Sequence, residues 1–250
     1  MPIYSAERLE YGITCGHIQI VTEAGKTLPA YWAHPNTGRL FPAIALIHDW
    51  WGITPIIRRI ANFFAQSGYY VIVPDLFDGQ VASTPQQAIE LLQALGDDGY
   101  PRINAALSVL ESHHNTNRDV AAVGIGMGGS LAYEAAIVRE DMEAAVAFYG
   151  FPQRYLGRFS EANAPILGLY GEDDPYILPP VIARLRNELA ANSGGLAHEI
   201  ATFAGAGHGF FHEEASDAER EVGRQALKKT FAFLEQHLRG PQKSPARQVY

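Results

Sequence analysis

The fold is decided by the stretch Val123-Gly124-Ile125-Gly126-Met127-Gly128-Gly129-Ser130. The apolar residues 120–123 before it predict a buried strand, and residues 131–138 after it predict a helix. A strand, a tight glycine turn and a helix make a nucleophile elbow, which lifts one residue above the carboxyl edge of a parallel sheet. The stretch therefore predicts an α/β protein whose chemistry lies at this turn.

The centre of the turn holds a glycine where a nucleophilic side chain is expected. In the pattern glycine-x-nucleophile-x-glycine, Gly124 and Gly128 are the outer glycines and Gly126 is the central residue. The central residue of an elbow has strained backbone angles that cost a non-glycine residue roughly 1–3 kcal/mol, and glycine adopts them almost freely. We interpret Gly126 as the position of a lost nucleophile. Ser130, the alternative, follows one helical turn later and is expected to point away from the site.

Outward from the turn, strands alternate with helices. Buried strands are predicted at 42–47, 69–73, 144–149, 165–170 and 198–203, and helices at 55–66, 85–95, 102–113, 179–191 and 218–238. This order implies a single α/β domain with a mostly parallel sheet of about eight strands and helices on both faces. Residues 14–23 and 28–33 predict a hairpin at an antiparallel N-terminal edge. The domain is expected to span residues 1–240, and residues 241–250 to form a flexible tail.

The composition narrows the possible partners. The 250 residues are 47% hydrophobic and carry a net charge of −8, which disfavours binding to nucleic acid and to anionic membranes. No uncharged run approaches the ~18 residues of a membrane span. Cys15 is the single cysteine, which suits a reducing compartment. Residues 1–8 lack the basic and apolar regions of a signal peptide, so we expect a cytoplasmic protein.

An acid and a histidine follow two later strands of the predicted sheet. Asp174 lies after the strand at 165–170, and His208 lies after the strand at 198–203. Groups at the carboxyl ends of parallel strands share one crevice. The order elbow, acid, histidine is the order of catalytic triads in α/β enzymes of this kind. Asp174 is expected to hold the tautomer of His208, and His208 to act as general base and then general acid.

These features, taken together, resemble those of the dienelactone hydrolase family of α/β-hydrolases across nearly all of residues 10–240. The similar pieces are the Gly-x-Gly-x-Gly-Gly turn, His48-Asp49-Trp50-Trp51-Gly52, residues 68–77, Gly171-Glu172-Asp173-Asp174 and Gly207-His208-Gly209-Phe210. The resemblance implies hydrolysis of a small-molecule carboxylic ester or lactone without a metal or organic cofactor. It also implies a Cys or Ser nucleophile at the elbow and an oxyanion hole made by the N–H groups of Met127 and Trp50.

The remaining pocket residues are expected in the loops around the turn. They are Asp49, Trp51, Phe210 and His212. Three of the positions depart from the family pattern. Gly126 replaces the nucleophile, Asp49 stands where the family usually has Glu, and the two arginines that bind a substrate carboxylate are absent, near Gly79 and at His212. The chain is therefore expected to be inactive or weakly active by the acyl-enzyme route.

Other interpretations of the same residues stay open at this point. The protein could bind a small ligand in the old pocket without catalysis. Gly124-x-Gly126-x-x-Gly129 also matches the dinucleotide-binding pattern, but the next strand ends without the acid that holds a ribose. His208, His212 and Glu213 invite a metal interpretation, which the glycines around His208 make unfavourable because they oppose a helix there. We therefore expect no metal.

Overall fold

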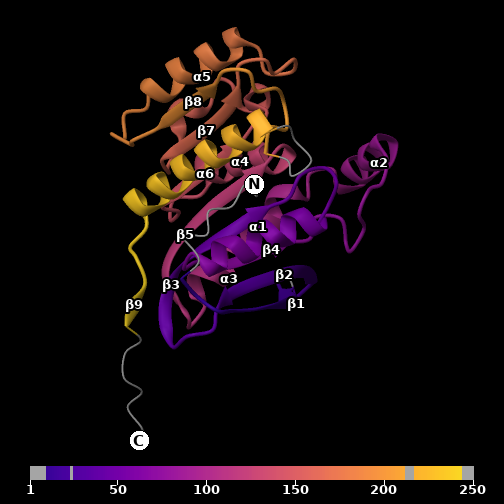
Figure 1. Cartoon of the computed structure of the whole chain (residues 1–250), viewed down its shortest axis with the longest axis vertical. Coiled ribbons are helices and arrows are strands. Elements are labelled where there is room, and N and C mark those ends of the chain that lie inside the picture. The colour runs from indigo at the N-terminus through magenta and orange to yellow at the C-terminus, as the bar shows by residue number, and fades with distance from the viewer. Residues whose placement is uncertain (1–9, 23–24, 212–216, 244–250) are drawn as a thin grey trace, which may run out of the picture.

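The computed structural model describes residues 10–22, 25–211 and 217–243, and in this part of the chain the strands form one sheet (Figure 1). The order of the strands across the sheet is β1-β2-β4-β3-β5-β6-β7-β8, and β9 pairs with β3. The strands are β1 Ile13–Val21, β2 Thr27–Pro35, β3 Arg39–Ile47, β4 Tyr70–Pro74, β5 Thr116–Ile125, β6 Ala144–Phe148, β7 Ile166–Gly171, β8 Glu199–Phe203 and β9 Gln242–Lys243. Strands β4, β3 and β5 to β8 run parallel.

The predicted α/β class, the mostly parallel sheet and its antiparallel N-terminal edge are confirmed. β1 pairs antiparallel with β2, and β2 pairs antiparallel with β4. The described residues give nine strands where about eight were predicted, because Gln242–Lys243 add a short antiparallel strand beside Arg39 and Leu40. This strand lies beyond the domain end predicted at residue 240, and residues 244–250 of the predicted tail lie outside the described residues.

The helices begin where the sequence supplies a capping side chain or a proline. They are α1 Pro55–Gln66, α2 Pro85–Leu95, α3 Gly99–Ser112, α4 Met127–Val138, α5 Pro179–Ala190 and α6 Asp217–His237, with 3₁₀ turns η2 Pro152–Tyr155 and η3 Phe159–Glu161. The Thr54 and Thr84 hydroxyls accept hydrogen bonds from the first turns of α1 and α2, and a proline follows each threonine. These two helices have the predicted bounds.

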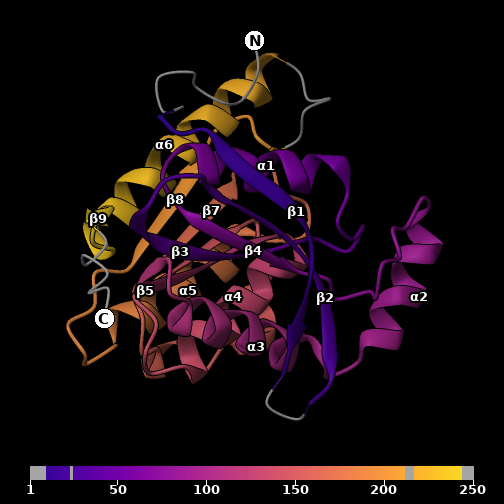
Figure 2. The same ribbon diagram turned by 90° about the horizontal axis from the view of Figure 1, so that it is seen from below.

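The helices cover both faces of the sheet (Figure 2). Helices α3, α4 and α5 pack on one hydrophobic core, and α1 and α6 pack on the other. Strand β3 lies between the two cores, with Ala43, Ala45 and Ile47 on one face and Ile44 and Leu46 on the other. Alternate side chains of a strand point to opposite faces, so burial on both sides explains the continuous apolar run in the sequence.

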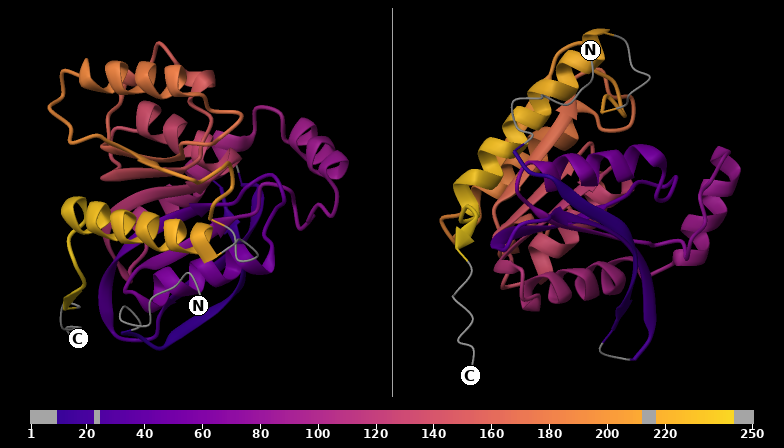
Figure 3. Two further views of the ribbon diagram at one scale, coloured as in Figure 1. Left: turned by 45° about the horizontal axis from the view of Figure 1, so that its top comes forward. Right: turned by 60° about the horizontal axis from the view of Figure 1, so that its bottom comes forward.

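Helix α2 lies apart from the rest of the fold (Figure 3). Only Ala88 and Leu95 of this helix are buried, while Ile89 and Leu92 are each 40% exposed. Leu92 and Leu95 line the large cavity described below. The helix therefore forms part of a cavity wall rather than part of either core.

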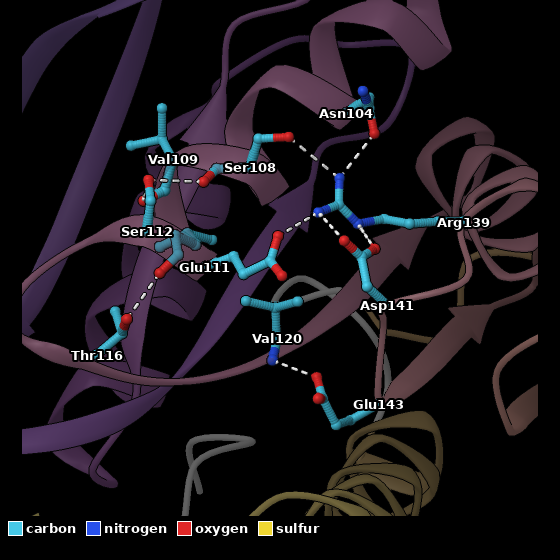
Figure 4. Close-up of polar contacts among 11 residues, drawn as sticks. Asn104, Ser108, Val109, Glu111, Ser112, Thr116, Val120, Arg139, Asp141 and Glu143 are labelled. Atoms are coloured by element: carbon cyan, nitrogen blue, oxygen red, sulfur yellow. Dashed lines mark hydrogen bonds and ion pairs between the residues drawn. The ribbon is translucent and has the colours of Figure 1, made fainter.

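Arg139, at the end of α4, ties that helix to α3 (Figure 4). Its guanidinium donates to Asn104 Oδ1 at 2.7 Å, to Glu111 Oε2 at 2.7 Å and to Asp141 Oδ2 at 3.1 Å. Arg139 is 8% exposed, and burying an arginine is tolerated only where carboxylates and other acceptors surround it. The network fixes the far end of α4, the helix that starts at the elbow.

No helix among the described residues is long and apolar enough to cross a membrane.

Candidate active site

The glycine turn joins β5 to α4 at the carboxyl edge of the sheet, as the elbow prediction requires. Gly126 has φ 56° and ψ −115°, and its N–H donates to Phe148 O on β6 at 2.9 Å. A positive φ is costly for residues that carry a Cβ. Met127 begins α4, and the first N–H groups of a helix have no acceptor within the helix. The turn therefore presents a backbone N–H beside the empty central position.

The glycines of the turn differ in what fixes them. A Cβ on Gly124 would lie 2.0 Å from Gly128 O, and a Cβ on Gly128 would lie 2.2 Å from Ile47 O. Backbone packing therefore requires both glycines. A Cβ on Gly126 would meet Asp49 Cβ at 3.4 Å and the Tyr149 ring at 3.7 Å, which are ordinary contacts. The site has room for a side chain at residue 126, and only the backbone angle opposes one.

Asp174 and His208 come together from the loops after β7 and β8. His208 Nδ1 donates to Asp174 Oδ2 at 2.8 Å, and Asp174 Oδ1 accepts the N–H groups of Tyr176 at 2.8 Å and Ile177 at 3.1 Å. The Asp174 side chain is fully buried, and that of His208 is 23% exposed. A neutral His208 with its proton on Nδ1 keeps Nε2 as the basic nitrogen. This arrangement is the acid–base half of a triad.

Aromatic rings surround the His208 imidazole. The ring centroids of Tyr149, Phe151 and Tyr176 lie 5.0, 5.1 and 5.2 Å from that of His208. Tyr149 has φ 40°, a strained angle for a residue with a Cβ, and such strain clusters at functional sites. Burial, reinforced by the Asp49 carboxylate, raises the pKa of Tyr149, so its hydroxyl stays protonated.

The loop after β3 brings tryptophans to the opposite side of the turn. Trp51 N donates to Asp49 Oδ1 at 3.0 Å, and the Trp50 and Trp51 rings meet edge to face at 5.2 Å. His48 fixes this loop from beneath: its Nδ1 donates to Asp49 O at 2.6 Å, and its Nε2 accepts the N–H of Leu76 at 3.1 Å. The loop is thus held to the segment that follows β4.

A cavity of about 1100 Å³ opens at the turn. Six of the residues predicted for the site line it, namely Gly126, His208, Met127, Trp50, Asp49 and Trp51, while Asp174 lies behind His208. The pocket prediction for Phe210 needs correction. Phe210 is 1% exposed and packs between Tyr149 and Phe203, because the chain after His208 turns into the core. The predictions for His212 and Glu213 lie outside the described residues.

Several cavity residues were not predicted from the sequence. Tyr149 and Phe151 follow β6, the strand beside the elbow strand, and Tyr176 follows Asp174. Their position at the carboxyl end of the sheet was a usable signal. Glu134 and Tyr155 also line the cavity, and they lie further from the turn.

The alternatives for the turn acquire structural explanations. Ser130 Oγ accepts the N–H of Phe151 at 2.9 Å, so the hydroxyl holds the loop after β6. The glycine spacing that resembles a dinucleotide site follows from packing: a Cβ on Gly129 would lie 2.9 Å from Gly150 Cα, and Gly124 is equally constrained. No phosphate is needed to account for either glycine.

Solved structures with this fold include a putative dienelactone hydrolase from Klebsiella pneumoniae, with a TM-score of 0.80, 24% identity, and coverage of 90% of this chain and 99% of that one. A dienelactone hydrolase-like promiscuous phosphotriesterase from metagenomic libraries gives a TM-score of 0.78 at 17% identity, covering 90% of this chain and 98% of that one. At these identities the likeness is one of fold.

Curated relatives extend the similarity to the sequence. A putative carboxymethylenebutenolidase of Escherichia coli is 29% identical over 219 residues, 79% of this chain and 78% of the relative. Protein usf of Aquifex pyrophilus is 26% identical over 224 residues, 86% of this chain and 95% of the relative. The dienelactone hydrolase family matches residues 28–238. This chain, whose elbow, acid and histidine occupy the expected strand ends, belongs to the dienelactone hydrolase family.

Proposed function

We propose that this protein binds a carboxylic ester or lactone in the elbow cavity and is inactive or weakly active, because it cannot form an acyl-enzyme. One observation carries the proposal: a glycine occupies the strained centre of the turn, at φ 56°, while the Asp174–His208 pair beside it is hydrogen-bonded at 2.8 Å. Covalent catalysis needs a side-chain nucleophile in this position, and Gly126 has none.

Any residual hydrolysis would pass through water. The space beside Asp49 and Tyr149 that a side chain at residue 126 would fill can admit a water molecule. His208 Nε2 would take a proton from that water as it attacks the substrate carbonyl, and the Met127 and Trp50 N–H groups would bind the developing oxyanion. Such a route forms no covalent intermediate and requires no cofactor.

The charges near the turn argue against a dienelactone as the substrate. The family's carboxylate-binding arginines have no counterpart at Gly79, which does not line the cavity and whose N–H donates to Asp75 Oδ2 at 2.8 Å. Asp49 adds a negative charge beside the turn. We therefore propose a substrate without a carboxylate close to the reacting carbonyl.

The protein is proposed to act in the cytoplasm. Cys15 is free and exposed, a state that a reducing compartment maintains.

Restoring the nucleophile tests the proposed function. Gly126→Cys and Gly126→Ser should raise the hydrolysis of para-nitrophenyl acetate at least ~10²-fold over the parent protein, with cysteine the better replacement because its thiol ionises more easily. Gly126→Cys should also show a burst of released nitrophenol, the mark of an acyl-enzyme, which the parent lacks. Rates and burst amplitude would be measured by absorbance.

Gly126→Ala is the matched control, since it adds the same Cβ and the same strain without a nucleophile. Both Gly126→Cys and Gly126→Ala should lose roughly 1–3 kcal/mol of stability, and only the cysteine variant should gain activity. Adding His208→Ala to Gly126→Cys should remove most of the gain. A folded Gly126→Cys variant with no gain on activated esters would contradict the proposed hydrolase geometry and leave ligand binding alone.

A further inference from the structure

The cavity continues from the turn along one face of α4. Met127, Ser130, Leu131 and Glu134 all line it, at the spacing of three and four residues that places helical side chains on one face. Gly126 and Glu134 are eight positions apart, which corresponds to about 12 Å along a helix axis. A ligand that reaches both ends therefore needs an extended body between its carbonyl and its far end.

The far end of the cavity combines a carboxylate with tyrosine rings. Glu134 Oε2 accepts the Tyr155 hydroxyl at 2.8 Å, and Tyr155, from η2, is 3% exposed. Tyr100, from α3, lines the same part of the cavity, and Glu134 raises its pKa together with burial, as expected for a close neighbour. Burial and the adjacent carboxylate likewise raise the pKa of Tyr155, so it remains a hydrogen-bond donor.

The basic side chain that lines this end does not neutralise Glu134. Arg154 is 63% exposed at its side chain, and its guanidinium lies 3.7 Å from Asp97, which also lines the cavity. Among the described residues, Glu134 forms no ion pair, and Tyr155 is its one hydrogen-bond donor. The carboxylate thus keeps its negative charge beside two aromatic rings, an arrangement that attracts cations electrostatically and through the ring faces.

We propose that the far end of the cavity, formed by Glu134, Tyr100 and Tyr155, binds an ammonium group of the ligand. This deepens the proposed function, because it assigns the same cavity an ester with an apolar body and a cationic end. The apolar wall between the two ends, which includes Leu131 and Leu95, suits the body. A carboxylate-bearing ligand of the same length would be repelled by Glu134.

Binding to the unmodified protein tests this assignment without any reaction. Hexylammonium, hexanol and hexanoate share one chain and differ in the charge of the head group. By titration calorimetry, hexylammonium should bind at least ~10-fold more tightly than hexanol, the factor that about 1.4 kcal/mol represents, and hexanoate should bind most weakly. Equal affinity for the three compounds would overturn the proposal.

Glu134→Gln separates charge from structure. Glutamine can still accept the Tyr155 hydroxyl, so the hydrogen bond between α4 and η2 survives while the charge is lost. The variant should keep its melting temperature and lose the preference for hexylammonium. Glu161→Gln, the same charge change on an exposed side chain of η3, should keep the preference. A Glu134→Gln variant that still prefers hexylammonium would rule out this carboxylate as the binding group.

A reactive pair of substrates keeps this test apart from that of the proposed function. In Gly126→Cys, the para-nitrophenyl ester of an ω-amino octanoate should have a lower KM than that of octanoate, and Glu134→Gln should remove the difference. Hydrolysis of both esters at the same KM would refute the ammonium site while supporting the hydrolase geometry. Preserved hexylammonium binding with no hydrolysis in Gly126→Cys would do the reverse.

Discussion

At the scale of single residues, His48 links the active-site loop to the rest of the fold. Asp49 O can only accept and the Leu76 N–H can only donate, so the two hydrogen bonds fix the proton of His48 on Nδ1. The side chain is completely buried, and burial lowers the pKa of His48, although the Asp49 carbonyl and the charge of Asp75 oppose the shift. Its neutral form is therefore part of the folded structure.

This pKa shift predicts how stability depends on pH. Above the ordinary histidine pKa of about 6.5, His48 is neutral in both the folded and the unfolded chain, and the full stability is present. As the pH falls below about 6.5, the unfolded chain takes up a proton that the fold excludes, so stability is lost until the pH reaches the lowered pKa of the folded state. Each excess proton contributes a slope of up to about 1.4 kcal/mol per pH unit.

Urea unfolding between pH 8 and pH 5 would measure this slope. Burial also lowers the pKa of His113, His198 and His237, so the contribution of His48 is obtained by difference. His48→Gln should unfold with a shallower pH dependence than the parent. Parallel curves for the two proteins would show that His48 is not the group that titrates.

The chemistry of Asp174 and His208 could be predicted from sequence, and that of Glu134 could not. The order of the two residues behind their strands placed them at one edge of the sheet, and the structure joins them by a hydrogen bond. Glu134 lies in the middle of a helix, where an acid is ordinarily a solvated side chain. Its meaning depends on Tyr100 and Tyr155, which arrive from two other elements. Such a convergence has no signature in any one segment.

At the scale of secondary-structure elements, predictability followed the local signals. Thr54-Pro55 and Thr84-Pro85 gave the starts of α1 and α2. The start of α4 at Met127 was missed, with a helix expected only from residue 131, because Gly128 and Gly129 have poor helix propensity. Tertiary packing overrides that propensity here, since both glycines press against neighbouring backbone.

The contact between α3 and α4 yields a prediction about stability. Arg139→Met should lower the free energy of unfolding by about 2–3 kcal/mol, somewhat less than the loss of a partner in a fully buried ion pair. The reason is that Glu111 and Asp141 lose their cation but keep partial access to solvent, at 36% and 52% exposure. Chemical denaturation in urea would measure the change.

Arg184→Met is the matched control for that substitution. Arg184 is 59% exposed and pairs with Glu188 one turn away on α5, and such surface pairs contribute within about 1 kcal/mol. Equal losses for the two variants would mean that the Arg139 network adds nothing beyond an ordinary surface pair.

At the scale of the whole molecule, the last helix completes a core that the first half of the chain begins. Phe231 of α6 contacts Phe63 and Phe64 of α1 and lies 6.1 Å, between ring centroids, from Tyr69. After α6, the Arg239 guanidinium binds the carboxylate of Asp119 on β5, and the Arg239 N–H donates to the same carboxylate at 2.7 Å. The C-terminal segment is thus fastened to the centre of the sheet.

This arrangement predicts that the chain unfolds as one unit and that α6 supports the distant active-site edge. Phe231→Ala should cost about 3–5 kcal/mol, because the ring is 1% exposed and its loss opens a cavity between α6 and α1. Phe231→Leu should cost only about 1 kcal/mol, since it conserves most of the volume. Tryptophan fluorescence, which reports Trp50 and Trp51 at the cavity, and far-ultraviolet circular dichroism, which reports all helices, should give one shared transition in each variant. If the fluorescence of Phe231→Ala changed at the parental urea concentration while the helical signal was lost earlier, the active-site edge would fold independently of α6, against the single cooperative unit argued here.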